Sequence, residues 1–449
     1  MAPSVCGRLG GWTAFVVAGL VVIQQASAQT WTVIDLGLGK GEDINANGQV
    51  VGDSAGRGWL WTDGVRTDIG SLDGTSHGWC VAFAINDLGQ IVGESRDALY
   101  RLRGFLWEDG VMTDLGVLSG TTSRAFEINN IGQVVGRSDC DPSGNHAYLW
   151  QGGVMTDLGT LDGSGASKAN DINESGQAVG WAGAPSVPDF RAVLWEDGVI
   201  TDLGTLGSTK SEAFEITESG IVVGYSYTAA DERHAFLWQD GVMTDLGTLP
   251  GASDSRAWNL NESGQVVGDS GGRAFMWQGG AMIDLNDLID PNTGWVLEVA
   301  YGINDAGQIV GGGTRMGGSS RAFLLNPPPI YALTITIEGG PPCYPYGHVE
   351  TDPYDPDGEY LAGTEVTLEA VPRDWKVFEH WQIYDPNHPG DANYAAISTD
   401  NPIAIVMDAD REVTAIFDRG QCGPGVEQML PVVLLVTGFC GFVSRRRGR

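Results

Sequence analysis

The chain has 449 residues, of which 57 are Asp or Glu and 25 are Lys or Arg, so its formal net charge is −32 at pH 7. Such a surface repels phosphate groups, which argues against nucleic acid and anionic lipid as partners. It is compatible with divalent cations or a saline environment.

Residues 1–28 have the pattern of a secretory signal peptide. Arg8 precedes an apolar run from Thr13 to Ile23, and Ala26-Ser27-Ala28 follows as a cleavage site. We therefore expect an exported protein whose mature chain begins at Gln29.

The body of the chain repeats one unit seven times. Each unit contains the phrase Ile-Asn-x-x-Gly-Gln-x-Val-Gly or a close variant, as in INDLGQIVG at 85–93 and INESGQAVG at 172–180, and the spacing is 41–44 residues. This period is typical of stacked or radially arranged supersecondary units. A residue that recurs in every unit is therefore expected to serve the fold.

Two hairpin signals in each unit predict four short strands, A to D. An Asn-x-x-Gly turn separates A from B, and Asp-Gly or Gly-Gly, as at Asp109-Gly110, joins C to D. The first unit begins at strand D (31–37) and the last ends at strand C (321–326), so pairing of the two would close a ring without open edges. A solenoid would instead need capping repeats. The predicted fold class is all-β, a seven-bladed β-propeller over 29–326 closed by the N-terminal strand; whether strand A or strand C is innermost is left open.

Two recurring residue types are predicted to be structural. A Trp ends strand C in six units and is expected to pack between blades. An Asp in phrases such as Thr-Asp-Leu-Gly is expected to accept a hydrogen bond from the backbone. The alternative for this Asp is a ring of carboxylates around a cation.

Beyond the repeats, Pro327-Pro328-Pro329 begins a stiff linker over 327–330. Strongly alternating segments over 331–418 predict a small all-β module. The tail, 419–449, has an apolar run from Met429 to Val443 followed by four arginines, which predicts either a cell-surface sorting signal or a plain C-terminal membrane anchor.

No pattern of catalytic or cofactor-binding residues is present. The six histidines are scattered singly, without the spacing of metal ligands. The alternating oxygen ligands of one acidic loop suggest a calcium site, although an ordinary acidic turn is the alternative; this loop contains Asp139, Asp141, Ser143 and Asn145. A similar pattern occurs at Asp355, Asp357 and Glu359. Cys80 and Cys140 are predicted to lie on the same face and form a candidate disulfide.

The loops from B to C and the links from D to A should emerge on one face of a propeller, opposite the tight hairpins. Variable loops on a rigid scaffold are common binding surfaces. The candidate ligand contacts on this face are Tyr100, Arg101, Arg103, Phe190, Tyr225, Tyr227 and Trp295.

Three resemblances follow from these phrases. RHAFLWQDGVMTDLGTL (233–249) and AFEITESGIVVGYS (213–226) resemble the HAF family of bacterial extracellular repeats over residues 30–326, which implies an exported propeller without a general enzymatic activity. YALTITIEGG, FEHW and PIAIVMDADREVTAIF resemble the bacterial surface module related to internalin B-repeats, which implies a β-grasp or sandwich-like module that acts as a spacer or in adhesion. The tail is similar to PEP-CTERM sorting signals but has Cys422-Gly423-Pro424-Gly425 in place of Pro-Glu-Pro.

The sequence thus predicts an exported binding protein of the cell surface or matrix, without enzymatic activity, whose ligand is an unidentified glycan or protein. Its other expected partners are the export and sorting machinery, with the membrane contacted only through the tail. A structural envelope component without a specific ligand is the first alternative. A propeller enzyme such as a polysaccharide lyase or glycosidase is the second.

Overall fold

The computed structural model describes residues 30–339 except 76–77, 141–143, 162, 164 and 185–186, and then 347–352, 359–361, 365–372, 378–384, 396–398, 402–406 and 411–417. The predicted signal peptide and C-terminal tail lie outside these residues. The chain divides into two compact units between Pro328 and Pro329. Among the described residues, no helix has the length and apolar character needed to cross a membrane.

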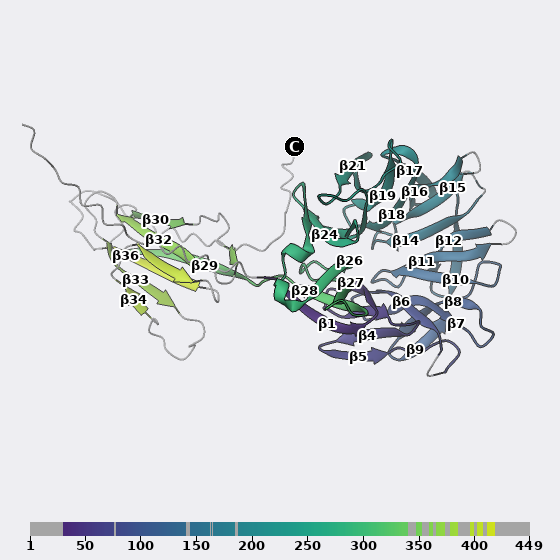
Figure 1. Ribbon diagram of the computed structural model, residues 1–449, viewed down its shortest axis with the longest axis horizontal. Coiled ribbons are helices and arrows are strands. Elements are labelled where there is room, and N and C mark those ends of the chain that lie inside the picture. Colours follow the sequence, from purple (N-terminus) through teal and green to yellow (C-terminus); the bar gives the residue numbers. More distant parts are fainter. Residues whose placement is uncertain are drawn as a thin grey trace, which may run out of the picture. The chain divides into compact units, whose positions relative to one another are not determined.

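The first unit is a seven-bladed β-propeller, which confirms the predicted fold (Figure 1). Each blade is one four-stranded antiparallel sheet. Blades 1 to 3 consist of β2 (Lys40–Ile44), β3 (Val50–Asp53), β4 (Gly58–Thr62), β5 (Val65–Asp68); β6 (Cys80–Ile85), β7 (Ile91–Arg96), β8 (Leu102–Glu108), β9 (Val111–Asp114); and β10 (Ser123–Ile128), β11 (Val134–Cys140), β12 (Gly144–Gln151), β13 (Val154–Gly159). Blades 4 to 6 consist of β14 (Ser167–Ile172), β15 (Ala178–Ala184), β16 (Val187–Glu196), β17 (Val199–Gly204); β18 (Gly207–Ile216), β19 (Val222–Thr228), β20 (Arg233–Gln239), β21 (Val242–Gly247); and β22 (Ser255–Leu260), β23 (Val266–Ser270), β24 (Arg273–Gln278), β25 (Ala281–Asp284).

Blade 7 closes the ring by combining both ends of the repeat region. It consists of β26 (Trp295–Ile303), β27 (Ile309–Arg315), β28 (Ser320–Asn326) and the N-terminal β1 (Thr32–Leu38). The register runs from Thr32 opposite Asn326 to Leu38 opposite Arg321, and Figure 1 shows β1 beside β28. The guanidinium of Arg321 on β28 also pairs with Asp35 on β1 at 2.9 Å.

Strand A is the innermost strand of every blade, which answers the question that the sequence left open. The sheet order is A-B-C-D, and each strand A packs against the strand A of both neighbouring blades, from β2·β6 round to β26·β2. Because A–B and C–D are tight hairpins, these turns lie on one face of the propeller, called here the hairpin face. The B–C loops and D–A links lie on the opposite face, called the loop face.

The glycine that ends each repeated phrase is needed because two backbones approach closely. Strand A has a register shift opposite this glycine in all seven blades, as between Ala169 and Asp171 opposite Gly180. A Cβ atom on Gly180 would lie 2.0 Å from the carbonyl oxygen of Lys168. The equivalent distance is 1.9–2.1 Å at Gly52, Gly93, Gly136, Gly224, Gly268 and Gly311, so only glycine fits beside the bulge.

The asparagine of the repeated phrase links neighbouring blades on the hairpin face. Within its own turn, the Asn45 side-chain oxygen accepts from the backbone N–H groups of Asn47 and Gln49. Its Nδ2 donates to the carbonyl of Asn86 in the next blade at 3.0 Å. The same link is made by Asn86, Asn129, Asn173, Asn261 and Asn304, and the Asn304 amide closes the circle on Asn45 at 3.1 Å. Blade 5 carries Thr217 at this position, so the chain of hydrogen bonds is interrupted between blades 5 and 6.

The recurring Trp and Asp residues have the structural roles predicted for them. Each Trp at the end of strand C contacts a hydrophobic cluster that spans two blades, as Trp150 does with residues of blades 2 and 3. Each Asp accepts a backbone hydrogen bond from the residue two positions later at 2.7–3.0 Å. It also pairs with strand C at 2.7–3.5 Å, through Arg in five blades and through His146 and His234 in the others. These Asp residues lie on the outermost strands, so they do not form a ring around a cation.

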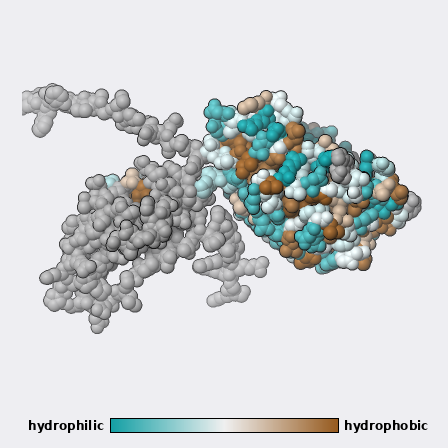
Figure 2. Space-filling view, turned by 90° about the horizontal axis from the view of Figure 1, so that it is seen from below, coloured by the Kyte–Doolittle hydropathy of each residue, from teal (hydrophilic) through white to brown (hydrophobic). Residues whose placement is uncertain are grey.

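Most exposed apolar side chains on the propeller are separate from one another, although Leu99 and Tyr100 are adjacent. Five valines that begin strand D are 62–65% exposed, namely Val65, Val111, Val154, Val199 and Val242. Figure 2 shows hydrophobic and hydrophilic residues interspersed over the propeller face in view, as is usual for protein surfaces.

The second unit is all-β in its described part. It contains β29 (Ile330–Gly339), β30 (Gly347–Asp352), β31 (Glu359–Leu361), β32 (Glu365–Pro372), β33 (Phe378–Tyr384), β34 (Ala396–Ser398), β35 (Ile403–Val406) and β36 (Arg411–Phe417). They form a five-stranded sheet, β31-β29-β36-β33-β34, and a three-stranded sheet, β30-β32-β35. Its buried side chains include Val366, Leu368, Trp381, Ile405 and Val413.

Candidate functional site

The innermost strands place three rows of side chains at the centre of the propeller. Counted back from the Ile or Leu of the repeated phrase, the fourth position forms a charged row: Lys40, Val81, Arg124, Lys168, Glu212, Arg256 and Val299. The second position forms an aromatic row: Glu42, Phe83, Phe126, Asn170, Phe214, Trp258 and Tyr301. The first position forms an acid row: Asp43, Ala84, Glu127, Asp171, Glu215, Asn259 and Gly302. The charged and aromatic rows, which lie nearer the loop face, are called here the axial mouth.

The axial mouth varies from blade to blade inside strands that otherwise repeat. Between the two rows stands Gly or Ala in every blade, and the phrase itself always begins with Ile or Leu. Those recurring residues are buried and form the contacts between blades. The variable residues are the ones not required by the repeat, so their differences are available for function.

Five rings form most of the aromatic row. The centroids of Phe83 and Phe126 are 5.4 Å apart, and those of Phe214 and Trp258 are 4.4 Å apart. Tyr301 continues this second group, 5.7 Å from Trp258. All five side chains are half-buried, so they expose aromatic surface while packing against one another.

Cations are concentrated on the side of the mouth formed by blades 3 and 4. The Lys168 ammonium lies 4.4 Å from the centroid of Phe126 and 3.5 Å from a carboxylate oxygen of Glu212. Arg124 pairs with Glu94 at 2.6 Å and lies opposite Arg137 in the register of β10 and β11. Burial lowers the pKa of Lys168, and the neighbouring arginines add to this effect although Glu212 opposes it.

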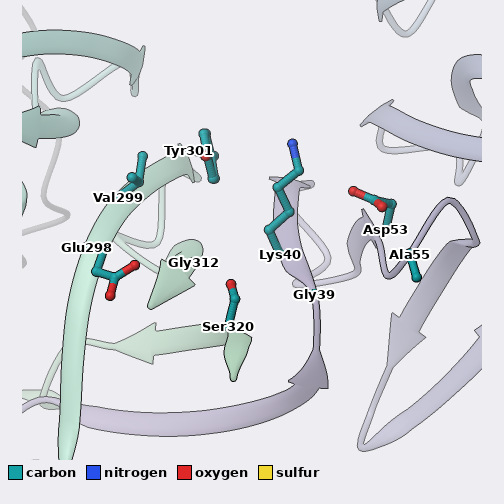
Figure 3. Close-up of a pocket in the computed structure, with 9 residues that line it drawn as sticks. All are labelled: Gly39, Lys40, Asp53, Ala55, Glu298, Val299, Tyr301, Gly312 and Ser320. Atoms are coloured by element: carbon teal, nitrogen blue, oxygen red, sulfur yellow. The ribbon is translucent and has the colours of Figure 1, made fainter. Parts of the chain in front are cut away.

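A pocket of about 260 Å³ opens at the mouth between blades 7 and 1. In Figure 3, Lys40 of β2 stands between Tyr301 of β26 and Asp53 of β3. Glu298 and Ser320 also line the pocket, and the Lys40 ammonium lies 5.4 Å from the Tyr301 ring centroid. Hydroxyl, ammonium and carboxylate groups therefore line one pocket beside an aromatic ring, and the Lys40 ammonium also pairs with Glu42.

The acid row lies deeper on the same axis. Burial raises the pKa of Asp43 to about 6 and that of Asp171 to about 7. The backbone N–H groups that donate to both carboxylates oppose this rise. For example, Asp171 accepts from the N–H of Ile216 in the next blade at 2.6 Å. Burial together with the other axial carboxylates holds the pKa values of Glu127 and Glu215 well above the ordinary value. Three of these side chains keep some exposed surface, but the surrounding blades and like charges still disfavour their ionised forms.

The predicted ligand contacts divide between the outer loops and the core. Tyr100 is 80% exposed with φ of 59° in the loop between β7 and β8. Arg101 is held by Asp97 at 2.6 Å, and Arg103 lies 3.3 Å from Asp114. These three residues are on the rim, away from the innermost strands.

Phe190 packs on Trp181 with a centroid distance of 5.6 Å, and Tyr227 packs on Tyr225 at 6.2 Å. Tyr225 does reach the axial mouth, because its hydroxyl donates to Glu212 at 3.0 Å. The prediction for Trp295 was wrong. It begins β26, is only 7% exposed and packs on Phe323, because two short 3-10 turns, η1 (Leu285–Asp287) and η2 (Pro291–Thr293), bring the chain back into the sheet.

The predicted calcium loop is only partly described. Asp141 and Ser143 lie outside the described residues, as do Asp355 and Asp357. The carboxylate of Asp139 accepts from the N–H and the hydroxyl of Thr122 at 2.9 and 2.7 Å, and Asn145 lies opposite it across β11 and β12. Calcium binding therefore stays a prediction.

The predicted disulfide between Cys80 and Cys140 is not formed. Cys80 is fully buried in the cluster between blades 1 and 2, beside Ile69. Cys140 ends β11 in blade 3, and its sulfur lies 3.7 Å from Asp157. Cys80 therefore lies at the interface of blades 1 and 2, whereas Cys140 contacts the outermost strand of blade 3.

The axial mouth was not predicted from the sequence, where attention went to the variable loops. The signal was present as the alternation of constant and variable residues within strand A. Reading it required knowledge that strand A, and not strand C, lies on the axis.

Comparisons with known proteins give a family match within the second unit and a likeness of fold for the first. Residues 346–421 match the divergent InlB B-repeat domain family. No curated protein matches the chain in sequence.

Among solved structures, the chain is similar to an extracellular domain from B. thetaiotaomicron described as part of a one-component system (8% identity, 66% of this chain and 40% of that chain, TM-score 0.45). It is also similar to the Pyrococcus horikoshii acylaminoacyl peptidase (11%, 68% and 61%, TM-score 0.38) and to the Aleuria aurantia lectin in complex with α-methyl-L-fucoside (14%, 52% and 86%, TM-score 0.29). The chain thus spans less than two thirds of the length of the first two proteins. At these identities the likeness concerns the fold alone.

Proposed function

We propose that the chain is an exported binding protein whose axial mouth binds a saccharide. The observation that carries this proposal is a set of five half-buried aromatic side chains on the innermost strands, Phe in three blades, Trp in blade 6 and Tyr in blade 7, at a variable position between the recurring Gly or Ala and the recurring Ile or Leu. An aromatic ring can pack on the apolar face of a sugar, and neighbouring charged or hydroxyl groups can bind its hydroxyls. Tyr301, Lys40 and Asp53 provide both kinds of group around one pocket, and the Trp258 ring lies beside Tyr301, 5.7 Å away between centroids.

The size of the pocket limits what can enter it. Its volume of about 260 Å³ is slightly below the range of about 300–1,000 Å³ that is usual for sites of drug-sized ligands. A single sugar ring or the end of a chain suits this volume better than an internal stretch of polysaccharide. Further rings of a longer ligand would extend along the aromatic row.

Export is supported by the signal-peptide pattern of residues 1–28 and by the match of residues 346–421 to a divergent InlB B-repeat domain. The resemblance of residues 30–326 to HAF repeats agrees with it. We infer that the second unit spaces the propeller from a surface and that the tail, 419–449, retains the protein there. Mass spectrometry of the cell-surface fraction would show whether the mature chain begins at Gln29 and keeps its tail.

A glycan array probed with the purified protein tests saccharide binding, and two variants locate the site. Trp258→Ala removes a central ring of the mouth, whereas Tyr100→Ala removes an exposed ring from the rim of the same face. We expect the first variant to lose binding and the second to retain it. The opposite result would move the site to the outer loops, and failure of the unmodified protein to bind any glycan would favour a structural role without a specific ligand.

An enzymatic role has one observation in its favour. The mouth is asymmetric and brings Tyr301, Lys40 and carboxylates together, as a lyase or glycosidase site would. No histidine occurs on the innermost strands in the described part of the chain. Release of new reducing or unsaturated ends from a bound polysaccharide would establish catalysis, and its absence with intact binding would leave a lectin-like role.

A further inference from the structure

Blade 3 departs from its neighbours where strands β11, β12 and β13 meet on the loop face. The sulfur of Cys140, an imidazole nitrogen of His146 and a carboxylate oxygen of Asp157 all lie within 4.8 Å of one another. Nδ1 of His146 is 2.8 Å from Oδ2 of Asp157, and Sγ of Cys140 is 3.7 Å from the same oxygen. Each side chain comes from a different strand of the blade.

We propose that Cys140, His146 and Asp157 bind a divalent transition-metal ion, with Zn²⁺ as the preferred ion. Thiolate, imidazole and carboxylate are the three types of protein ligand that Zn²⁺ takes, with bonds of about 2.0–2.3 Å. Tetrahedral geometry at those bond lengths separates the ligand atoms by roughly 3.5 Å. The two spacings to Asp157, 2.8 and 3.7 Å, lie on either side of this value, and the sulfur and the imidazole nitrogen are within 4.8 Å of each other, so side-chain movements of about 1 Å would admit the ion. Three protein ligands leave the fourth position to water.

The other blades carry only the structural pair between strand C and the Asp of strand D, without the cysteine that blade 3 adds. The Asp on strand D pairs with an arginine in five blades, and a guanidinium cannot ligate a cation. Blade 5 has the pair His234–Asp245, which could supply two ligands. Only blade 3 adds a cysteine, because the residue four positions after the phrase glycine is Gly56, Asp97, Ala184, Thr228, Gly272 and Arg315 in the others.

Local surroundings favour a fixed site. His146 is only 7% exposed, so its surroundings restrict the movement of the ring, while Asp157 keeps 38% of its side-chain surface. The N–H of Gly159 donates to Oδ1 of Asp157 at 2.7 Å, which orients the carboxylate and leaves Oδ2 toward Cys140. Such outer contacts commonly orient metal ligands. The ion would tie the ends of β11 and β13 together across β12.

Metal titration of the purified, reduced and chelator-treated protein tests the site. We expect one equivalent of Zn²⁺ to bind in competition with a chromophoric chelator. We also expect Co²⁺ to give a thiolate-to-metal charge-transfer band and the visible bands of tetrahedral cobalt. Cys140→Ser should abolish the charge-transfer band and weaken binding at least about tenfold, as loss of a ligand must weaken it at least as much as loss of an outer contact.

His146→Gln should weaken Zn²⁺ binding, whereas His234→Gln, which changes the matched pair of blade 5, should leave it unchanged. If His146→Gln fails to fold, Cys140→Ser decides the question, because Cys140 is half-buried at the end of a strand. Zn²⁺ binding that is unchanged in Cys140→Ser would overturn the proposal, as would the absence of Zn²⁺ binding by the unmodified protein. Binding of Ca²⁺ but not Zn²⁺ would also overturn it and would support the oxygen-ligand loop instead.

Discussion

Replacing Thr217 by Asn should add the hydrogen bond that is missing between blades 5 and 6. In the other blades this asparagine donates from Nδ2 to the next blade, as Asn261 donates to the carbonyl of Asn304 at 3.1 Å. The Thr217 hydroxyl accepts from the N–H of Ile221 at 3.0 Å but has no donor that reaches the carbonyl of Asn261. The reverse exchange, Asn304→Thr, would remove the bond to Asn45 that joins the last blade to the first.

The size of each stability change follows from the gain or loss of one hydrogen bond, which is partly offset because the same groups bond to water in the unfolded chain. A typical intramolecular bond contributes about 0.5–1.5 kcal/mol net. Thr217→Asn should gain about 0.5–1 kcal/mol, because Ile221 replaces the glutamine that accepts the second amide hydrogen in other blades, as Gln49 does from Asn45. Asn304→Thr should lose about 1–2 kcal/mol, since the side-chain oxygen of Gln308 loses its donor as well.

Guanidinium unfolding of the two variants and the unmodified protein would measure these changes as shifts of the midpoint at constant slope. The expected shifts have opposite signs, and a change of 1 kcal/mol corresponds to about 2 °C in Tm for a propeller of this size. Thr217→Val serves as a control that removes the hydroxyl without adding a donor. Destabilisation by both Thr217→Asn and Asn304→Thr would refute the view that these bonds between blades stabilise the ring.

Three further predictions concern the same framework. Gly180→Ala should destabilise the propeller by about 1–3 kcal/mol, because its methyl group would lie 2.0 Å from a carbonyl oxygen. The control Gly183→Ala, in the same strand, has its nearest contact at 3.5 Å and should be neutral. Equal urea midpoints for the two variants would contradict this. The free energy of unfolding should fall as the pH rises from about 5 to about 8. The reason is that Asp43 and Asp171, with pKa values raised to about 6 and about 7, keep protons in the folded state that the unfolded chain has released. Unfolding measured at each pH tests this, and a rise in stability over this range would refute the assignment. Deletion of 30–38 should expose the edge of blade 7 and cause association, visible in light scattering behind size exclusion; a monomer with unchanged Tm would argue against closure by β1.

The propeller could be predicted because its determinants recur. Turn residues such as Asn129 and Gly132 set hairpins locally, and the split of one blade between the chain ends specified a closed ring. The role of Gly136 beside a bulge was not predictable, since the close approach to the Arg124 carbonyl is visible only when the strand register is known. The number of blades could therefore be predicted from the repeat, whereas the reason why individual residues recur could be seen only in the structure.

The candidate site was less predictable, because it depends on which strand faces the axis. Phe214 and Trp258 read as ordinary strand residues in the sequence, and the outer loops drew the prediction to Tyr100 and Trp295. Trp295 proved to be core because β26 begins earlier than the repeat spacing suggests. Positions that vary inside a constant pattern were the better guide in this chain.

Closure by the first strand has a consequence for how the chain is made. Thr32 pairs with Asn326, so β1 leaves the ribosome or the export channel long before its partner exists. Contacts between residues so distant in sequence form slowly, and unpaired strands invite aggregation meanwhile. Six blades can fold from local contacts while β1 is still unpaired. The final step of folding therefore depends on β1 not pairing with a strand of another chain in the meantime.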